Sequence, residues 1–368
     1  MDRWYSITNE NDVSTPALLV YPQRVESNIL KMISITGDPA RLRPHVKTHK
    51  MPELVKLQMK SGISKFKCAT IAEAEMTLDC GVKDLLLAYQ PVGPNIGRFF
   101  RLRKKFPDAE FSCIADCREV IMLLSENALK LNLEARVWID INVGMDRTGV
   151  YPDETAAGLY RLLLESPMLR AEGLHVYDGH IHESDPAVRR RICDEAYEPV
   201  QRLIPVLQKM SGRQVRIIAG GTPTFPFHAL RDGVETSPGT SLLWDYGDST
   251  SFTDLDFRHA AVLMTRIVSK PAKDLICLDL GHKAVASEFP QPRIRLPELG
   301  KYEIRGHNEE HMVIRTTEAS GLKVGDVLYA IPYHICPTVD RYDTVTVVTG
   351  GAATDEWQVT ARKRRITV

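Results

Sequence analysis

The segment Leu42-Arg43-Pro44-His45-Val46-Lys47-Thr48-His49-Lys50 starts as a short strand-like run and ends with a cluster of basic side chains. Alternation along a strand would place Lys47 on one face and Val46 and Thr48 on the other. Taken alone, a basic segment of this kind fits a solvated sheet edge. Its place at the head of a long series of strand–helix units favours a different interpretation.

Strand-like and helical segments alternate from about residue 40 to residue 250. This alternation predicts parallel strands joined by crossover helices. Eight such strands fit a closed (β/α)8 TIM barrel, an α/β fold of roughly 250 residues, and an open doubly wound sheet is the alternative. The expected strands are 42–46, 65–69, 84–90, 110–115, 136–142, 171–177, 215–219 and 233–236, and the expected helices are 51–59, 71–80, 94–105, 117–131, 152–163 and 185–210.

The pattern of expected secondary structure changes after Phe257, where strand-like runs are separated by tight turns instead of helices. Gly321, Gly325 and the Gly350-Gly351 pair supply turn signals, which predict an antiparallel β domain. We therefore assign residues 13–255 to the barrel and residues 256–368 to a C-terminal β domain. The expected strands of this domain are 260–267, 274–280, 312–316, 327–331, 344–349 and 357–361.

Composition excludes several classes of function. Lys+Arg and Asp+Glu both number 47, so the formal net charge is zero. A neutral chain gives no indication that nucleic acid or a membrane surface is a partner. No apolar run approaches the ~20 residues that span a bilayer, and the acidic N-terminal segment lacks the apolar core of a secretory signal. The seven cysteines form no CxxC pair, which fits a reducing cytoplasm.

The polar residues that follow the expected strands would gather at one rim of the barrel, where barrel enzymes have their active sites. Lys47 ends the first strand, and a lysine amine can form a Schiff base with an aldehyde cofactor when its environment lowers its pKa. Arg147 lies in the loop after the fifth strand, and Tyr177 ends the sixth. The rim therefore carries several candidate catalytic and binding residues.

The loops after the seventh and eighth strands, which bind phosphate in many barrels, combine glycines with hydroxyl groups. Each loop alone could be an ordinary turn, and neither resembles a P-loop. Together with Lys47 they predict pyridoxal 5'-phosphate, with Tyr177 against its ring and Arg147 at the ring nitrogen. A salt-bridged arginine and a half-buried tyrosine are the structural alternatives. The candidate phosphate-binding residues are Gly220, Gly221, Thr222, Gly239 and Thr240.

The segment Tyr333-His334-Ile335-Cys336-Pro337 is a candidate metal site. On an extended segment, His334 and Cys336 would point to the same side, about 7 Å apart. Imidazole and thiolate both bind zinc and similar ions, and two protein ligands leave positions open for water and substrate. Asp340 is a possible further ligand, whereas a core cysteine and a half-exposed histidine are the structural alternative.

These motifs together resemble the D-threonine aldolase and D-serine dehydratase family, in order and over nearly the whole chain. That family belongs with the alanine-racemase-like, fold-type III pyridoxal phosphate enzymes, which pair a barrel with a β domain. The resemblance implies that Lys47 rather than Lys50 holds the cofactor, and that residues 1–12 can join the β domain. It also implies that His334 and Cys336 hold a divalent metal ion (Zn, Mn or Mg). The matching residues are Pro44-His45-Val46-Lys47-Thr48-His49-Lys50, Gly220-Gly221-Thr222, Pro238-Gly239 and His334-x-Cys336.

The resemblance implies a lyase of D-amino acid metabolism that cleaves D-threonine-like 3-hydroxy amino acids to glycine and an aldehyde. His182, with His180 next to it, is the expected base for the substrate hydroxyl. A D-serine dehydratase that yields a keto acid and ammonia is the alternative, and a racemase or a non-catalytic cofactor carrier is less favoured. We expect a cytoplasmic homodimer that binds a small D-amino acid and neither nucleic acid nor membrane.

Overall fold

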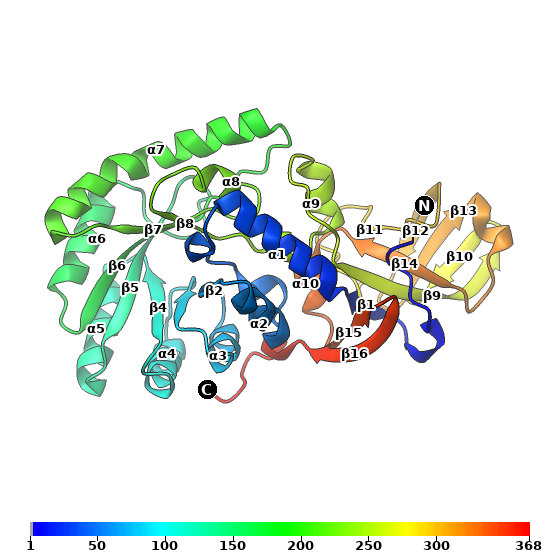
Figure 1. The fold of residues 1–368 in the computed structure, drawn as a ribbon, viewed down its shortest axis with the longest axis horizontal. Helices are drawn as coiled ribbons and strands as arrows, with labels where there is room; N and C mark the ends of the chain where they lie inside the picture. The colour runs from blue at the N-terminus through cyan, green and yellow to red at the C-terminus, as the bar shows by residue number, and fades with distance from the viewer. Residues whose placement is uncertain (1–2) are drawn as a thin grey trace. The chain divides into compact units, whose positions relative to one another are not determined.

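The computed structural model describes residues 3–368, which divide by their contacts into two units (Figure 1). The first, here called the parallel-sheet unit, comprises Leu30–Lys47, Pro52–Gly239 and Ala361–Val368. The second, here called the β unit, comprises Met1–Ile29, Thr48–Met51 and Thr240–Thr360. Helix α1 (Pro22–Thr36) passes from the β unit into the parallel-sheet unit.

Seven parallel strands form one curled sheet in sequence order, β2 to β8, and Figure 1 shows the crossover helices along its outer side. This confirms the α/β class and seven of the strands predicted from the alternation of segments. The strands are β2 (Lys65–Cys68), β3 (Asp84–Leu87), β4 (Glu110–Ala115), β5 (Ala135–Ile141), β6 (Leu169–Val176), β7 (Arg216–Ala219) and β8 (Val234–Thr236). The helices are α2 (Pro52–Lys60), α3 (Ile71–Asp79), α4 (Pro94–Lys105), α5 (Arg118–Leu131), α6 (Glu154–Glu165), α7 (Pro186–Ser211) and the short α8 (Phe225–His228).

The prediction of a regular strand over residues 42–46 is wrong. Leu42 makes a single parallel bridge to Thr236 of β8, and His45 makes one to Lys67 of β2. Pro44 has no N–H to donate to a ladder, although its carbonyl accepts a hydrogen bond from the Lys67 amide at 2.9 Å. The segment then tightens into a 3-10 turn over Val46–Thr48.

Local signals in the sequence explain where the helices begin and end. Thr70 caps α3 by accepting a hydrogen bond from the Glu73 amide at 3.1 Å, and the Glu73 carboxylate accepts one from the Ala69 amide at 2.7 Å. The two bonds satisfy backbone donors at the start of the helix in a manner similar to a capping box, although the Glu73 carboxylate binds the residue before the N-cap. Helix α7 begins after Asp185 and ends at Gly212, whose φ of 66° is in the left-handed region that favours glycine.

Buried ion pairs close the amino-terminal end of the parallel sheet. Arg43 is fully buried and donates to Asp84 at 2.7 Å and to Glu235 at 2.8 Å. Arg216 and Lys65 bond to the same carboxylate, Glu235, at 3.1 and 2.7 Å. The opposite, carboxyl end of the strands is therefore the end that is left for a binding site.

The β unit is built on a nine-stranded sheet in which β1 and β15 pair in parallel and the other neighbours are antiparallel. This confirms a separate antiparallel domain, although the predicted strand 357–361 starts earlier, as β16, and ends at Gln358. The strands are β1 (Ala17–Val20), β9 (Ala261–Ala272), β10 (Leu275–Leu278), β11 (Ile294–Arg295), β12 (Tyr302–His307), β13 (Met312–Thr316), β14 (Val327–Pro332), β15 (Thr344–Thr349) and β16 (Ala352–Gln358). Two short helices, α9 (Tyr246–Ser251) and α10 (Ile335–Val339), complete the unit.

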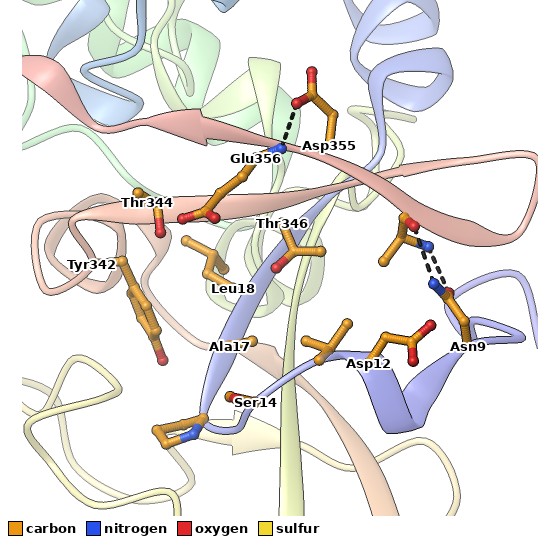
Figure 2. A pocket seen from close by; sticks show the side chains of 13 residues that line it. Asn9, Asp12, Ser14, Ala17, Leu18, Tyr342, Thr344, Thr346, Asp355 and Glu356 are labelled. Atoms are coloured by element: carbon orange, nitrogen blue, oxygen red, sulfur yellow. Dashed lines mark hydrogen bonds between the residues drawn. The ribbon is translucent and has the colours of Figure 1, made fainter.

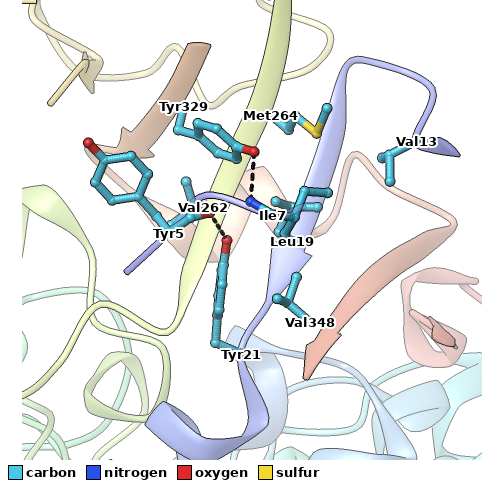
Figure 3. Packing of buried hydrophobic residues seen from close by; sticks show 9 residues of the cluster. All are labelled: Tyr5, Ile7, Val13, Leu19, Tyr21, Val262, Met264, Tyr329 and Val348. Carbon is cyan, nitrogen blue, oxygen red and sulfur yellow. Dashed lines mark hydrogen bonds between the residues drawn. The ribbon is translucent and has the colours of Figure 1, made fainter. Parts of the chain in front are cut away.

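Residues near the N-terminus contribute to the core of the β unit. Figure 3 shows Tyr5 and Ile7 packed with Leu19, Met264 and Tyr329. The Tyr329 hydroxyl accepts a hydrogen bond from the Ile7 amide at 3.0 Å, so this aromatic core also satisfies a buried backbone group. Among the described residues, no helix combines the length and the apolar character needed to cross a membrane.

Candidate active site

Lys47 lies in the 3-10 turn that follows the irregular segment 42–45, and its side chain is half-buried. Its amide donates to the His45 Nδ1 at 3.3 Å, which fixes the turn locally. The Lys47 Nζ lies 5.9 Å from the centroid of the Tyr177 ring, directly after β6. The structure therefore brings the predicted nucleophile and the predicted ring-contacting residue together.

Tyr177 is the centre of a group of three cations. Besides Lys47, the Lys67 Nζ lies 5.4 Å from its ring centroid, and the Arg147 guanidinium carbon lies 5.0 Å from it. Contacts of this length allow cation–π attraction. The convergence of two lysines and an arginine creates a site that favours an anionic ligand.

Sequence reasoning missed Lys67, which is only 2% exposed. Burial, together with the charge of Lys47, lowers the pKa of Lys67 to about 7 despite the nearby Asp140 and Asp178. The signal was available, because Lys65 and Lys67 both fall on the inward face of β2, where an apolar side chain is the usual occupant. A lysine on that face therefore indicates a binding or catalytic site.

The loop that carries Arg147 is held by Asn142, whose side-chain oxygen accepts hydrogen bonds from the amides of Gly144 at 3.0 Å and Asp146 at 3.1 Å. Below the loop, the His175 Nδ1 lies 2.7 Å from the Asp140 carboxylate. Burial lowers the pKa of His175 even though Asp140 opposes the shift. Asp140, Arg147, His175 and Tyr177 line one small cavity, so these side chains share the same space.

The predicted phosphate-binding glycines fall into two groups. Gly221 approaches Tyr177 so closely that a Cβ would lie 3.1 Å from the ring, which makes glycine the fitting residue there. The Thr222 hydroxyl accepts a hydrogen bond from the Gly239 amide at 3.1 Å and thereby joins the two loops. The Gly220 amide donates to the Val176 carbonyl at 3.0 Å and the Gly221 amide donates to the Thr224 hydroxyl at 3.2 Å, whereas Thr240 lies in the β unit.

The two candidate histidines differ in their surroundings. His182 is exposed, and its Nδ1 lies 2.6 Å from the His180 carbonyl oxygen. His180 is half-buried, and its ring lies against Gly144, where a Cβ would be 3.1 Å from the Nε2. His180 therefore contacts the loop that carries Arg147, whereas His182 points to solvent.

The metal pair lies in the β unit, where the segment is helical rather than extended as predicted. His334 is the N-cap residue of α10, and Cys336 falls in its first turn, because the Asp245 carboxylate accepts the Ile335 amide at 2.9 Å and starts the helix. The Cys336 Sγ lies 3.3 Å from the Thr48 hydroxyl and 3.9 Å from the Thr240 hydroxyl.

His334 has the polar surroundings of a ligand. Its Nδ1 hydrogen bonds to Glu288, which orients the ring and leaves Nε2 for a metal. Burial alone would lower its pKa, but hydrogen bonds to Cys336 and Glu288 and the charges of Cys336 and Asp245 raise the pKa to about 9. This concentration of negative groups suits a cation.

Two buried carboxylates beside this pair were also missed by the sequence analysis. Burial and the charge of Cys336 raise the pKa of Asp248 to about 7, and one of its buried carboxylate oxygens has no hydrogen-bond partner among the described residues. Asp245 caps α9 by accepting the Asp248 amide at 2.8 Å. Asp340, the further ligand considered above, instead forms an ion pair with Lys50 at 3.4 Å.

The β unit also has a groove of about 550 Å³ beside β1, β15 and β16 (Figure 2). Asp12, Tyr342, Asp355 and Glu356 are among the side chains around it. None of the residues predicted to hold the cofactor or the metal lines this groove. The chemistry-bearing side chains are concentrated around Tyr177 and around His334.

Comparison with known proteins identifies the family. The alanine racemase N-terminal domain matches residues 20–245, and a putative serine dehydratase domain matches residues 260–348. A D-threonine aldolase from Arthrobacter sp. is 28% identical over 362 residues, which cover 95% of this chain and 93% of the relative. A D-serine dehydratase from Dictyostelium discoideum is 22% identical over 92% of this chain and 94% of the relative.

The crystal structure of D-threonine aldolase from Filomicrobium marinum superposes with a TM-score of 0.86 at 28% identity, covering 97% of this chain and 98% of the other. The two family models together span the segments that contain Lys47, Gly221 and His334. The chain therefore belongs to the alanine-racemase-like family of D-threonine aldolases and D-serine dehydratases, and the predicted enzyme class, a lyase, is confirmed.

Proposed function

We propose that this protein is a lyase, dependent on pyridoxal phosphate and a divalent metal ion, that cleaves D-threonine-like 3-hydroxy amino acids to glycine and an aldehyde. The observation that carries the proposal is the convergence of Lys47, Lys67 and Arg147 on the Tyr177 ring, against which Gly221 also packs. A lysine amine, an aromatic face and a glycine loop in a cationic site suit a phosphorylated aldehyde.

The residues present fit this cofactor. Lys47 would hold its aldehyde carbon, Tyr177 its ring, and the loop of Gly221 and Thr222 its phosphate, whose negative charge Lys67 would also favour. We further propose that the bridges of segment 42–45 to β8 and β2 complete the curled sheet as a (β/α)8 barrel. When bound, pyridoxal phosphate supplies an electron sink for the carbanion that remains after a bond to Cα breaks.

His334 and Cys336 would hold the divalent ion, whose chemistry is that of a Lewis acid toward a hydroxyl oxygen. Glu288 would keep the His334 ring oriented through its Nδ1. Within the chain itself, the step that remains is proton removal from the substrate hydroxyl, for which His180 and His182 are the available bases. Arg147 keeps its positive charge throughout and would leave a facing ring nitrogen unprotonated.

A D-serine dehydratase is the second candidate function, supported by the cysteine at position 336 and by full-length dehydratase relatives. In that reaction Lys47 would remove the α-proton and the β-hydroxyl would leave, so that a keto acid and ammonia result. The two reactions use the same residues of this chain and differ in which bond to the substrate breaks.

Proton NMR of D-threonine incubated with the protein, pyridoxal phosphate and Mn²⁺ or Zn²⁺ distinguishes the two functions, with paramagnetic Mn²⁺ removed by chelation before the spectra are recorded. We expect glycine and acetaldehyde, formed from D-threonine and not from L-threonine. Formation of 2-ketobutyrate and ammonia would establish the dehydratase instead. Since one group of relatives is named 3-hydroxy-D-aspartate aldolase, D-3-hydroxyaspartate should be tested in parallel, and no conversion of either substrate would contradict both functions.

The histidine that acts as the base can be identified with a matched pair of variants. We expect His180→Asn to lower the rate of D-threonine cleavage by about a hundredfold or more, as general-base catalysis contributes 10²–10⁴-fold. His182→Asn should stay within a few-fold of the wild type, because its ring is exposed and held to the His180 carbonyl. Single-turnover cleavage rates of the two variants, measured with saturating cofactor, test this expectation. A larger loss of rate in His182→Asn than in His180→Asn would assign the base to His182.

A further inference from the structure

A buried polar cluster lies behind the glycine loop at the end of β7. It joins the carboxylate that follows Tyr177 to two side chains from the segment after that loop, Thr224 and His228. We propose that Asp178 is the positioning residue for the phosphate-binding loop, which it holds through Thr224 and His228. This inference rests on the proposed function, because it assumes that the loop binds the cofactor phosphate.

Asp178 is only 2% exposed and uses both carboxylate oxygens. The Thr224 hydroxyl donates to one oxygen at 2.7 Å, and the His228 Nε2 lies 2.8 Å from the other. Thr224 and His228 are each 1% exposed, so water does not compete for these bonds. Burial alone would raise the pKa of Asp178, but its bonds to His228 and Thr224 lower it, which favours the ionised acceptor.

Thr224 links Asp178 to the glycine loop. Its hydroxyl oxygen also accepts a hydrogen bond from the Gly221 amide at 3.2 Å. Gly221 is the residue whose backbone packs against the Tyr177 ring, and Tyr177 immediately precedes Asp178. One carboxylate therefore fixes the loop relative to the aromatic face on which the cofactor ring would lie.

The His228 ring packs against the glycine loop at Gly220. Arg231 donates to the His228 Nδ1 at 2.8 Å, so Nε2 carries the proton that is given to Asp178. The His228 ring lies under Gly220, where a Cβ would be 2.8 Å from the ring carbon Cδ2. The φ of 82° at Gly220 also requires glycine, so ring and loop are matched to each other.

The same cluster could be taken for a metal site, because ligand atoms of Asp178, Cys193 and His228 lie within 4.8 Å of one another. The Arg231 guanidinium lies 3.9 Å from the Cys193 sulfur and hydrogen bonds to the histidine, which places a positive charge where a cation would have to bind. Burial and the charge of Asp178 raise the pKa of the Cys193 thiol to about 12, which disfavours the thiolate ligand. A hydrogen-bonded cluster without metal explains the geometry better.

The test compares pyridoxal phosphate with pyridoxal, which has the same aldehyde and lacks the phosphate. In Asp178→Asn, the amide keeps the shape of the side chain but cannot accept both bonds. We expect its dissociation constant for pyridoxal phosphate to rise by about 10- to 100-fold, the usual range for a lost hydrogen bond to a charged group, and that for pyridoxal to change less than threefold. Inorganic phosphate should compete with the cofactor in the wild type and much less in the variant.

Two further variants separate positioning from stability. Thr224→Val removes the bond to the Gly221 amide and should reproduce the loss that is selective for the phosphate. Cys193→Ala changes the same cluster without removing an Asp178 bond to the loop, and it should bind both ligands as the wild type does. Circular dichroism and thermal unfolding check that each variant is folded.

Equal losses for pyridoxal and pyridoxal phosphate in both Asp178→Asn and Thr224→Val would overturn the inference, as would unchanged affinity for both ligands. An equivalent of bound metal that disappears in Cys193→Ala and remains in His334→Ala would assign the cluster to a metal instead. Wild-type protein that binds neither pyridoxal compound would contradict the proposed function itself, and this outcome is distinguishable from failure of the positioning role alone.

Discussion

Replacing Lys47 by alanine is expected to remove the visible absorbance of lysine-bound pyridoxal phosphate and to lower turnover of D-threonine by at least about a thousandfold, since loss of a covalent catalytic group has effects of this size or larger. The physical reason is that the amine beside the Tyr177 ring is the group that would bond to the cofactor aldehyde. Absorbance titration with pyridoxal phosphate and single-turnover kinetics measure the two effects.

Lys50 and Lys67 make this experiment specific. Lys50 forms an ion pair with Asp340 in the β unit, so Lys50→Ala should leave the absorbance band in place. Borohydride reduction of the wild-type complex followed by peptide mass spectrometry should locate the cofactor on Lys47. Modification of Lys67 would assign the bond to the buried lysine that the sequence analysis did not consider.

The second large effect is expected at the metal pair. His334→Ala should weaken binding of Zn²⁺ or Mn²⁺ by more than about a hundredfold, because changes to outer contacts alone already cost about 10- to 100-fold. Metal-dependent cleavage should disappear with it, whereas the absorbance of the bound cofactor should remain. Competition with a chromogenic chelator measures the metal affinity without depending on activity.

Glu288→Gln is the matched control for this variant. Its side chain still reaches the His334 Nδ1, but the negative charge is lost, so a decrease in affinity of about tenfold is expected. Thr48 and Thr240 offer hydroxyls near Cys336 and should not replace the histidine. Metal affinity that is unchanged in His334→Ala, or turnover that survives chelation in the wild type, would contradict the metal assignment.

The alternation of short apolar strands with amphipathic helices was sufficient to predict the seven parallel strands, because hydrophobic period and turn residues are local properties of the chain. Irregular geometry was not predictable in the same way. The first strand is replaced by single bridges at Leu42 and His45, since Pro44 interrupts the donors of a ladder. Similarly, α10 forms around Cys336 because Asp245, distant in sequence, accepts the Ile335 amide.

The candidate site was predictable where a residue type carries the chemistry. Lys47 was a candidate because a lysine amine can bond to an aldehyde cofactor, and His334 and Cys336 were candidates because two metal-binding side chains are close in sequence. Asp178 and Lys67 became candidates only through their burial and their contacts with residues that are distant in sequence, which the fold brings together. The exposure that distinguishes His180 from His182 likewise comes from the fold and cannot be obtained from sequence spacing.

The way in which the chain is divided between the two units limits how such an enzyme can evolve by recombination. The chain passes from one unit to the other five times, after Ile29, Lys47, Met51, Gly239 and Thr360. Lys47 and Thr48 are consecutive residues, yet they belong to different units. No contiguous gene fragment therefore encodes either unit alone. Recombination with a homologous gene at a single crossover between residues 30 and 360 would therefore combine segments of both parents within each unit, and these segments would have to pack against one another.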